Sequence, residues 1–95
     1  MNYIKFLEGW YQANCNSDWE HNFGIKIETL DNPGWYIEVD LEDTFQESLD
    51  VKEIFLNSEI DWLRLETKNK KLIGSADPTK LETLLLRIRE LLDEK

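Results

Sequence analysis

The sequence is poor in the two residue types that most often bind metals or act as nucleophile and base. It has one cysteine, Cys15, and one histidine, His21, among 95 residues. A single cysteine cannot form a disulfide within the chain, which favours a reducing compartment. A structural zinc site needs several cysteine or histidine ligands, and a cysteine enzyme needs a histidine base oriented by a third group. We therefore predict no catalytic residues and no metal site.

Closely spaced glycines and long apolar runs are also missing. The four glycines are not spaced as a phosphate-binding loop requires, so we predict no nucleotide cofactor. No stretch approaches the roughly 18 consecutive apolar residues that a membrane-spanning helix needs. The N-terminal residues lack the basic stretch and apolar run of a signal peptide. We expect a cytoplasmic protein that does not enter a membrane.

Positive charge is scarce in the first half of the chain. Residues 1–50 contain two lysines, Lys5 and Lys26, against eleven aspartates and glutamates, whereas the charges of residues 51–95 cancel, so the total is -9. Such a field repels nucleic acid and anionic membranes, and it attracts cationic proteins. The same composition is also explained by solubility alone. Charge alone therefore leaves a basic protein partner and solubility as equal alternatives.

The length and composition are typical of one folded unit. Ninety-five residues, 41% of them hydrophobic, suffice for a core that forms without disulfides or metal. We expect residues 1–95 to form a single domain.

The first third of the chain predicts a helix followed by a hairpin. Apolar and aromatic residues recur at intervals of three and four over residues 3–14, which is typical of one helix face. Residues 25–30 and 35–42 alternate apolar and polar side chains, as strands do. The turn between them contains Pro33 and Gly34, and we expect Gly34 to adopt the positive φ of a type II turn.

Two registers of this hairpin pair side chains that point to the same face of the sheet. One places Ile27 opposite Ile37 and Lys26 beside Glu38. A shift of two residues places Glu28 against Glu38 instead. Like charges across strands are unfavourable, so we favour the first register.

The rest of the chain predicts three further strands and a helix. Strands are expected over residues 51–57, 62–68 and 71–75, with a tight turn at Asn69 and Lys70. For the final helix, Asp77 is the expected N-cap and Pro78 the first helical position, before leucines at helical spacing. The predicted fold is α+β, an antiparallel meander sheet of about five strands flanked by an N-terminal and a C-terminal helix.

Aromatic residues among the carboxylates of the first half indicate a binding surface. Protein interfaces concentrate their energy in such rings, surrounded by charges that orient the partner. Trp35 lies on the apolar strand face and is expected in the core, whereas Trp19 and Tyr36 are expected to be exposed. The candidate partner-binding residues are Asp18, Trp19, Glu20, Glu28, Asp31, Tyr36, Glu38 and Asp40.

The run from Trp19 to Trp35, WEHNFGIKIETLDNPGW, resembles the signature of the immunity protein 53 family of bacterial polymorphic toxin systems. Trp10, Tyr11 and Asp18 are similar to the same pattern, and a weaker resemblance extends through Trp62 to the C-terminal helix. The resemblance implies a cytosolic protein that protects its producer by neutralising a cognate toxin. It names neither the toxin nor any catalytic residue.

Charge and resemblance together give the leading hypothesis. Polymorphic toxins are often nucleases with basic clefts, and an acidic surface carrying aromatic rings could block such a cleft. One alternative is a small enzyme that uses Cys15 and His21. Another is a non-catalytic adaptor domain whose acidic face serves solubility. The oligomeric state stays open, because the aromatic stripe of the first helix could also form a dimer contact.

Overall fold

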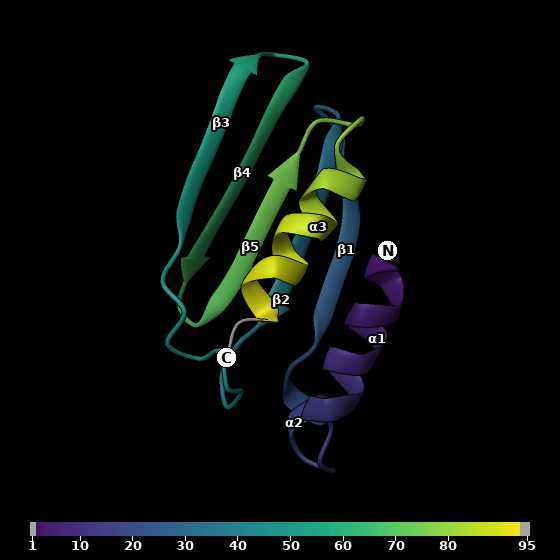
Figure 1. Cartoon of the computed structure of the whole chain (residues 1–95), viewed down its shortest axis with the longest axis vertical. Coiled ribbons are helices and arrows are strands. Elements are labelled where there is room, and N and C mark those ends of the chain that lie inside the picture. Colours follow the sequence, from purple (N-terminus) through teal and green to yellow (C-terminus); the bar gives the residue numbers. More distant parts are fainter. Residues whose placement is uncertain (1, 94–95) are drawn as a thin grey trace.

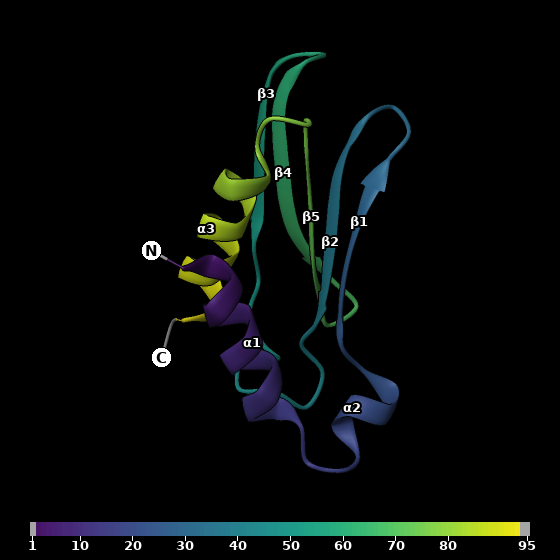
Figure 2. The same cartoon turned by 90° about the vertical axis from the view of Figure 1, so that its right-hand side faces the viewer.

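The computed structural model describes residues 2–93 as one sheet with two long helices on one of its faces (Figure 1; Figure 2). This arrangement confirms the predicted α+β class, with antiparallel strands flanked by an N-terminal and a C-terminal helix. None of the helices within residues 2–93 is long and apolar enough to cross a membrane. The elements, in chain order, are α1 (Tyr3–Asn14), α2 (Trp19–Asn22), β1 (Ile25–Leu30), β2 (Gly34–Asp40), β3 (Lys52–Ser58), β4 (Asp61–Lys68), β5 (Lys71–Ala76) and α3 (Leu81–Leu92).

The sheet is built from two units that meet at its centre. The strand order is β1-β2-β5-β4-β3, so the hairpin β1–β2 joins the three-stranded unit β3–β4–β5 through the pairing of β2 with β5. The register of the hairpin is the one favoured above, with Ile27 opposite Ile37 and Lys26 opposite Glu38. Strands β1 and β3 form the two edges of the sheet.

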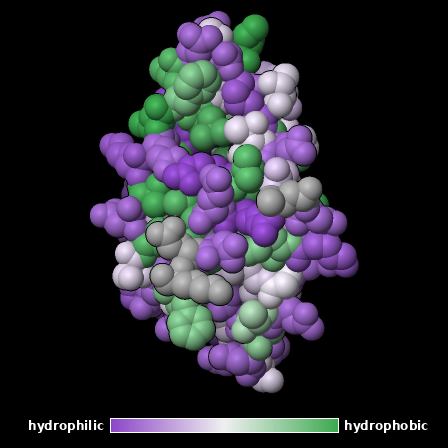
Figure 3. Space-filling model, in the orientation of Figure 1, coloured by the Kyte–Doolittle hydropathy of each residue, from purple (hydrophilic) through white to green (hydrophobic). Residues whose placement is uncertain are grey.

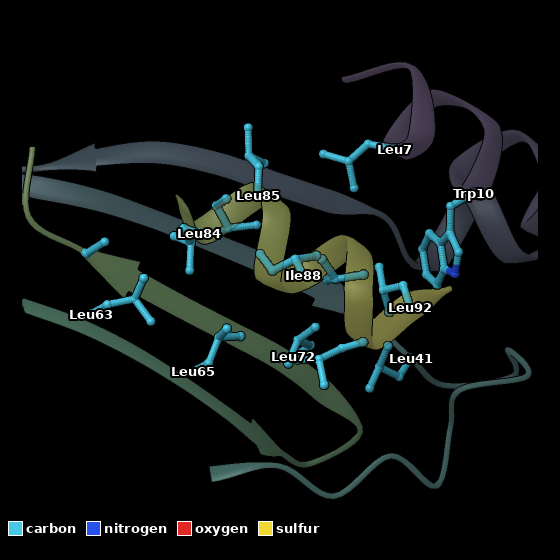
Figure 4. Packing of buried hydrophobic residues seen from close by; sticks show 14 of the residues in the cluster. Leu7, Trp10, Leu41, Leu63, Leu65, Leu72, Leu84, Leu85, Ile88 and Leu92 are labelled. Atoms are coloured by element: carbon cyan, nitrogen blue, oxygen red, sulfur yellow. The ribbon is translucent and has the colours of Figure 1, made fainter. Parts of the chain in front are cut away.

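The core lies between α3 and the middle of the sheet (Figure 4). Ile37, Leu65 and Leu72 from three neighbouring strands are fully buried beneath Leu84 and Ile88 of α3. Gly74 lets α3 approach β5, because a Cβ at this position would lie 2.8 Å from Leu84 Cδ1. Helix α1 extends this core with Leu7 and Trp10, which are also buried.

The start of α3 differs from the prediction. The helix begins at Leu81 with Lys80 as N-cap, so the expectation that Asp77 caps the helix and Pro78 begins it was wrong. Asp77 is instead fully buried and accepts hydrogen bonds from the N–H groups of Trp62 and Thr79, both at 2.8 Å. The Lys80 ammonium lies 2.6 Å from Asp77 and also contacts Asp61. Asp77 therefore ties β4 to the turn that leads into α3.

These contacts make the stability depend on pH. Burial alone raises the pKa of Asp77, but hydrogen bonds from Lys80, Thr79 and the backbone of Trp62 outweigh it and hold the pKa well below its ordinary value. A lowered folded-state pKa stabilises the fold above the unfolded-state value of about 4, and this stabilisation is lost as the pH falls further.

We predict that Asp77→Asn lowers the free energy of unfolding at neutral pH and flattens its decline below about pH 4. Urea unfolding over a pH series measures both effects. Asp31→Asn, in an exposed turn, is the control and is expected to behave like the wild type. A decline in Asp77→Asn as steep as that of the wild type would contradict this role of Asp77.

Candidate binding surface

One face of the sheet carries no helix, because α1 and α3 both pack on the other (Figure 2). Within residues 2–93 we call this uncovered side the open face. Its side chains alternate with the buried ones along each strand and include five cations and four carboxylates, so it is close to neutral. The charged members are Lys26, Glu28, Glu38, Asp40, Lys52, Arg64, Glu66, Lys68 and Lys71.

Four of the predicted partner-binding residues lie together on the open face. Glu28 is paired with Tyr36 across β1 and β2, and Glu38 and Asp40 follow Tyr36 on the same side of β2. Lys71 of β5 lies opposite Asp40 and contacts both carboxylates, 3.2 Å from Glu38. The sequence did not reveal this lysine, because nothing in it shows that β5 pairs with β2.

A hydrogen bond between Tyr36 and Glu38 shifts the pKa of both side chains. The hydroxyl of Tyr36 donates to Glu38 at 2.7 Å; this bond and burial raise the pKa of Tyr36 to about 12. The same bond lowers the pKa of Glu38, with a further contribution from Lys71. Asp40 also accepts the N–H of Gly24 at 2.9 Å, which fixes the start of β1. Glu38 therefore stays ionised, and Lys71 pairs with it and with Asp40.

The open face also has a groove that the sequence did not predict. It has a volume of about 720 Å³ and lies between the β1–β2 turn and the β3–β4 hairpin, with Leu30, Pro33, Leu56 and Trp62 in its wall. Gly34 does not have the positive φ that we expected. A glycine is needed there for space, because a Cβ would lie 2.6 Å from the carbonyl oxygen of Ala76 and 3.3 Å from the Trp62 ring.

Trp19 does not belong to the surface, and the expectation that it is exposed was wrong. Its side chain is only 2% exposed and packs edge-on against Trp10, with ring centroids 6.0 Å apart. Its indole N–H donates to the carbonyl of Glu42 at 2.9 Å. The polar stretch thus contains a short helix, α2, and the ring of Trp19 on this helix is part of the core. Trp35 is half-buried on the helix-bearing face, where its indole N–H donates to the carbonyl of Pro78.

The remaining predicted residues are divided between the two ends of the molecule. Asp31 lies in the exposed β1–β2 turn, and Asp18 and Glu20 lie at α2, at the opposite end (Figure 1). Glu20 accepts the N–H groups of Asn16 and Ser17, both at 2.8 Å. Backbone hydrogen bonds, first that of its own N–H and then that of Asn16, lower its pKa. Glu20 thus stays ionised and stabilises the loop before α2.

The bond between Trp19 and Glu42 places α2 beside the connection from β2 to β3. We call these two segments, residues 16–22 and 42–50, the acidic end; they contain no lysine or arginine. Phe45 in the connection is 100% exposed. Lys70 of the β4–β5 turn lies 3.5 Å from Glu47. Within residues 2–93, Lys70 is the cation that forms an ion pair with a carboxylate of the acidic end. The carboxylates are Asp18, Glu20, Glu42, Asp43, Glu47 and Asp50.

Comparison with known proteins identifies the family. A family model described as Immunity protein 53 matches residues 4–93. The chain belongs to the immunity protein 53 family. No curated protein and no solved structure matches it.

Membership in this family supports an immunity function and implies a toxin as partner. Such immunity proteins are generally not catalysts. In this chain, the Cys15 thiol at the end of α1 donates to the carbonyl of Tyr11 at 3.2 Å. His21 is exposed on α2. No hydrogen bond joins Cys15 to His21, and no group of three possible metal ligands occurs within residues 2–93.

The buried position of Trp19 predicts a large effect on the stability of this immunity protein. Trp19→Ala removes a buried ring and is expected to cost about 3–5 kcal/mol in the free energy of unfolding, measured with urea. Phe45→Ala removes an exposed ring and is expected to change it by less than about 0.5 kcal/mol. Equal effects of the two substitutions would contradict the placement of these rings.

The bond between Tyr36 and Glu38 predicts a change in acidity. Tyr36→Phe removes the hydroxyl that lowers the pKa of Glu38, so that pKa is expected to rise towards its ordinary value. NMR titration of the side-chain carboxyl carbons measures it, and Tyr11→Phe on α1 is the control. An unchanged titration of Glu38 in Tyr36→Phe would show that the bond does not form in solution.

Proposed function

We propose that this immunity protein neutralises a cognate polymorphic toxin, in the cytoplasm of the producing cell, by occupying the toxin's basic cleft. Family membership and the charge of -9 support this proposal. A nuclease is the toxin class we favour, because a cleft that binds nucleic acid is basic and the acidic half of this chain has the complementary charge. Binding, with no covalent chemistry, suffices for this role.

The acidic end is the part of the surface best suited to such a cleft. Within residues 2–93, its carboxylates form one ion pair with a lysine, Lys70, whereas Glu28, Glu38 and Asp40 on the open face are paired with Lys26 or Lys71. Asp40 is the last residue of β2, and the acidic end resumes two residues later at Glu42. Of the predicted residues, Asp18 and Glu20 belong to the acidic end, whereas Glu38 and Asp40 belong to the open face.

Phe45 is the observation that carries the proposal. Its ring is fully exposed, and aromatic residues, phenylalanine among them, are enriched in protein interfaces. Hydrogen bonds hold the loop around it. The N–H of Asp43 donates to Glu47, and the side chain of Gln46 accepts from the Trp10 indole at 3.1 Å and donates to the carbonyl of Leu92 at 3.0 Å. A preformed loop loses little conformational entropy on binding.

The first test concerns the ring. Phe45→Ala is expected to weaken binding to the toxin encoded beside this gene by roughly thirtyfold or more, measured by calorimetry. Ile60→Ala is the matched control, because Ile60 is 81% exposed in the β3–β4 turn and outside the acidic end. Equal affinities of the wild type and Phe45→Ala would reject Phe45 as the anchor.

The second test concerns charge. Asp18→Lys/Glu42→Lys is expected to slow association at low salt by about tenfold or more. Glu8→Lys/Glu82→Lys makes the same charge change on α1 and α3 and is the control. Glu28→Lys/Glu38→Lys probes the open face. If this third variant alone slows association, the toxin binds the open face and not the acidic end. If the wild type binds no toxin, the adaptor interpretation is favoured.

A further inference from the structure

The two edges of the sheet differ in a way that the toxin partner does not explain. Edge strand β1 alternates charged and apolar residues, with Lys26 and Glu28 on its open face. Charges of this kind discourage pairing with another strand. Edge strand β3 has three consecutive apolar residues instead, Ile54, Phe55 and Leu56, which are 57%, 49% and 66% exposed. Figure 3, which looks onto the helix-bearing side, shows hydrophobic residues among hydrophilic ones over this hairpin.

The backbone of β3 can accept another strand. Residues of an antiparallel strand alternate between those whose N–H and C=O face the neighbour and those whose groups face away. The N–H of Thr67 donates to the carbonyl of Val51 at 2.9 Å, and the register continues unbroken to Leu56. Lys52, Ile54 and Leu56 therefore direct their backbone groups to the free edge. No strand within residues 2–93 pairs with that edge.

Apolar surface lies on both sides of this edge. On the helix-bearing side, a hollow of about 310 Å³ between β3 and α3 is lined by Phe55, Leu63 and Leu86. Arg87 bonds Glu53 at 2.9 Å across the same hollow, so its charges are paired. On the open face, Ile54 and Leu56 lie beside the groove that contains Trp62. A strand added next to β3 would bring apolar side chains to both faces.

We propose that this strand is β3 of a second copy, paired antiparallel about a twofold axis so that the two sheets become one. The distribution of charge along the chain favours a second copy over the toxin at this edge. The charges of residues 51–95, which include β3, β4, β5 and α3, cancel, whereas residues 1–50 carry the whole net charge of -9. Because β1 and β3 are opposite edges, a contact at β3 keeps the acidic strands of the two copies apart. A cationic toxin is attracted to the acidic half instead.

The register that pairs the three apolar residues of β3 with one another is centred on Phe55. It places Ile54 opposite Leu56 of the second copy. Ile54 and Leu56, whose backbone groups face outward, form the hydrogen-bonded pairs. The two Phe55 residues form the close pair without hydrogen bonds, in which side chains approach most nearly.

The test uses the purified protein alone, so it does not depend on the toxin. Sedimentation equilibrium over a concentration series is expected to show a dimer for the wild type and a monomer for Ile54→Lys, with the dimer dissociation constant raised at least tenfold. Ile27→Lys is the matched control, because Ile27 is 45% exposed on the opposite edge, and it is expected to stay dimeric. Circular dichroism checks that both variants fold.

A second measurement tests the register. Phe55→Cys in a Cys15→Ser background is expected to form an intermolecular disulfide under mild oxidation, because Cα atoms of a close antiparallel pair lie about 4.5 Å apart. Ile27→Cys in the same background is expected not to. A monomeric wild type, or a dimer unaffected by Ile54→Lys, would overturn the proposal. If the wild type is monomeric and Ile54→Lys abolishes toxin binding, the added strand comes from the toxin.

Discussion

The pairing of β2 with β5 is the constraint on which the rest of the structure depends. It joins the hairpin β1–β2 to the unit β3–β4–β5, and α3 covers the junction with Leu84 packed over Gly74. Because of this pairing, Lys71 lies between Glu38 and Asp40, and the turns of the two units form the walls of one groove. The same junction places β1 and β3 at opposite edges of the sheet.

This topology separates two kinds of surface. The carboxylates of the first half extend from the open face to the acidic end, where the core residues Trp10 and Trp19 anchor the loops that bear them. The apolar residues of β3 lie at the other edge, among charges that are balanced. Toxin binding and self-association can therefore use different parts of the molecule. A dimer built in this way would present two acidic ends.

Much of the fold could be predicted because it depends on local patterns. The alternation around Ile27 and Ile37 and the cost of opposing Glu28 to Glu38 gave the correct hairpin register. The tight turn at Asn69 and Lys70 is present, and both residues have positive φ. Contacts between distant segments were not predictable. Trp19 stands among polar residues, and only its packing against Trp10 shows that it is buried. Asp77 is a residue type that often caps helices, but here it accepts the N–H of Trp62 and forms an ion pair with Lys80.

The most direct test of the central claim is hydrogen exchange of the immunity protein with and without its toxin. If the acidic end binds the cleft, backbone amides of residues 16–22 and 42–50 become protected in the complex, while those of α3 and β4 exchange as before. Protection confined to the β3–β4 hairpin or to the helix-bearing face, with the acidic end unchanged, would contradict the account.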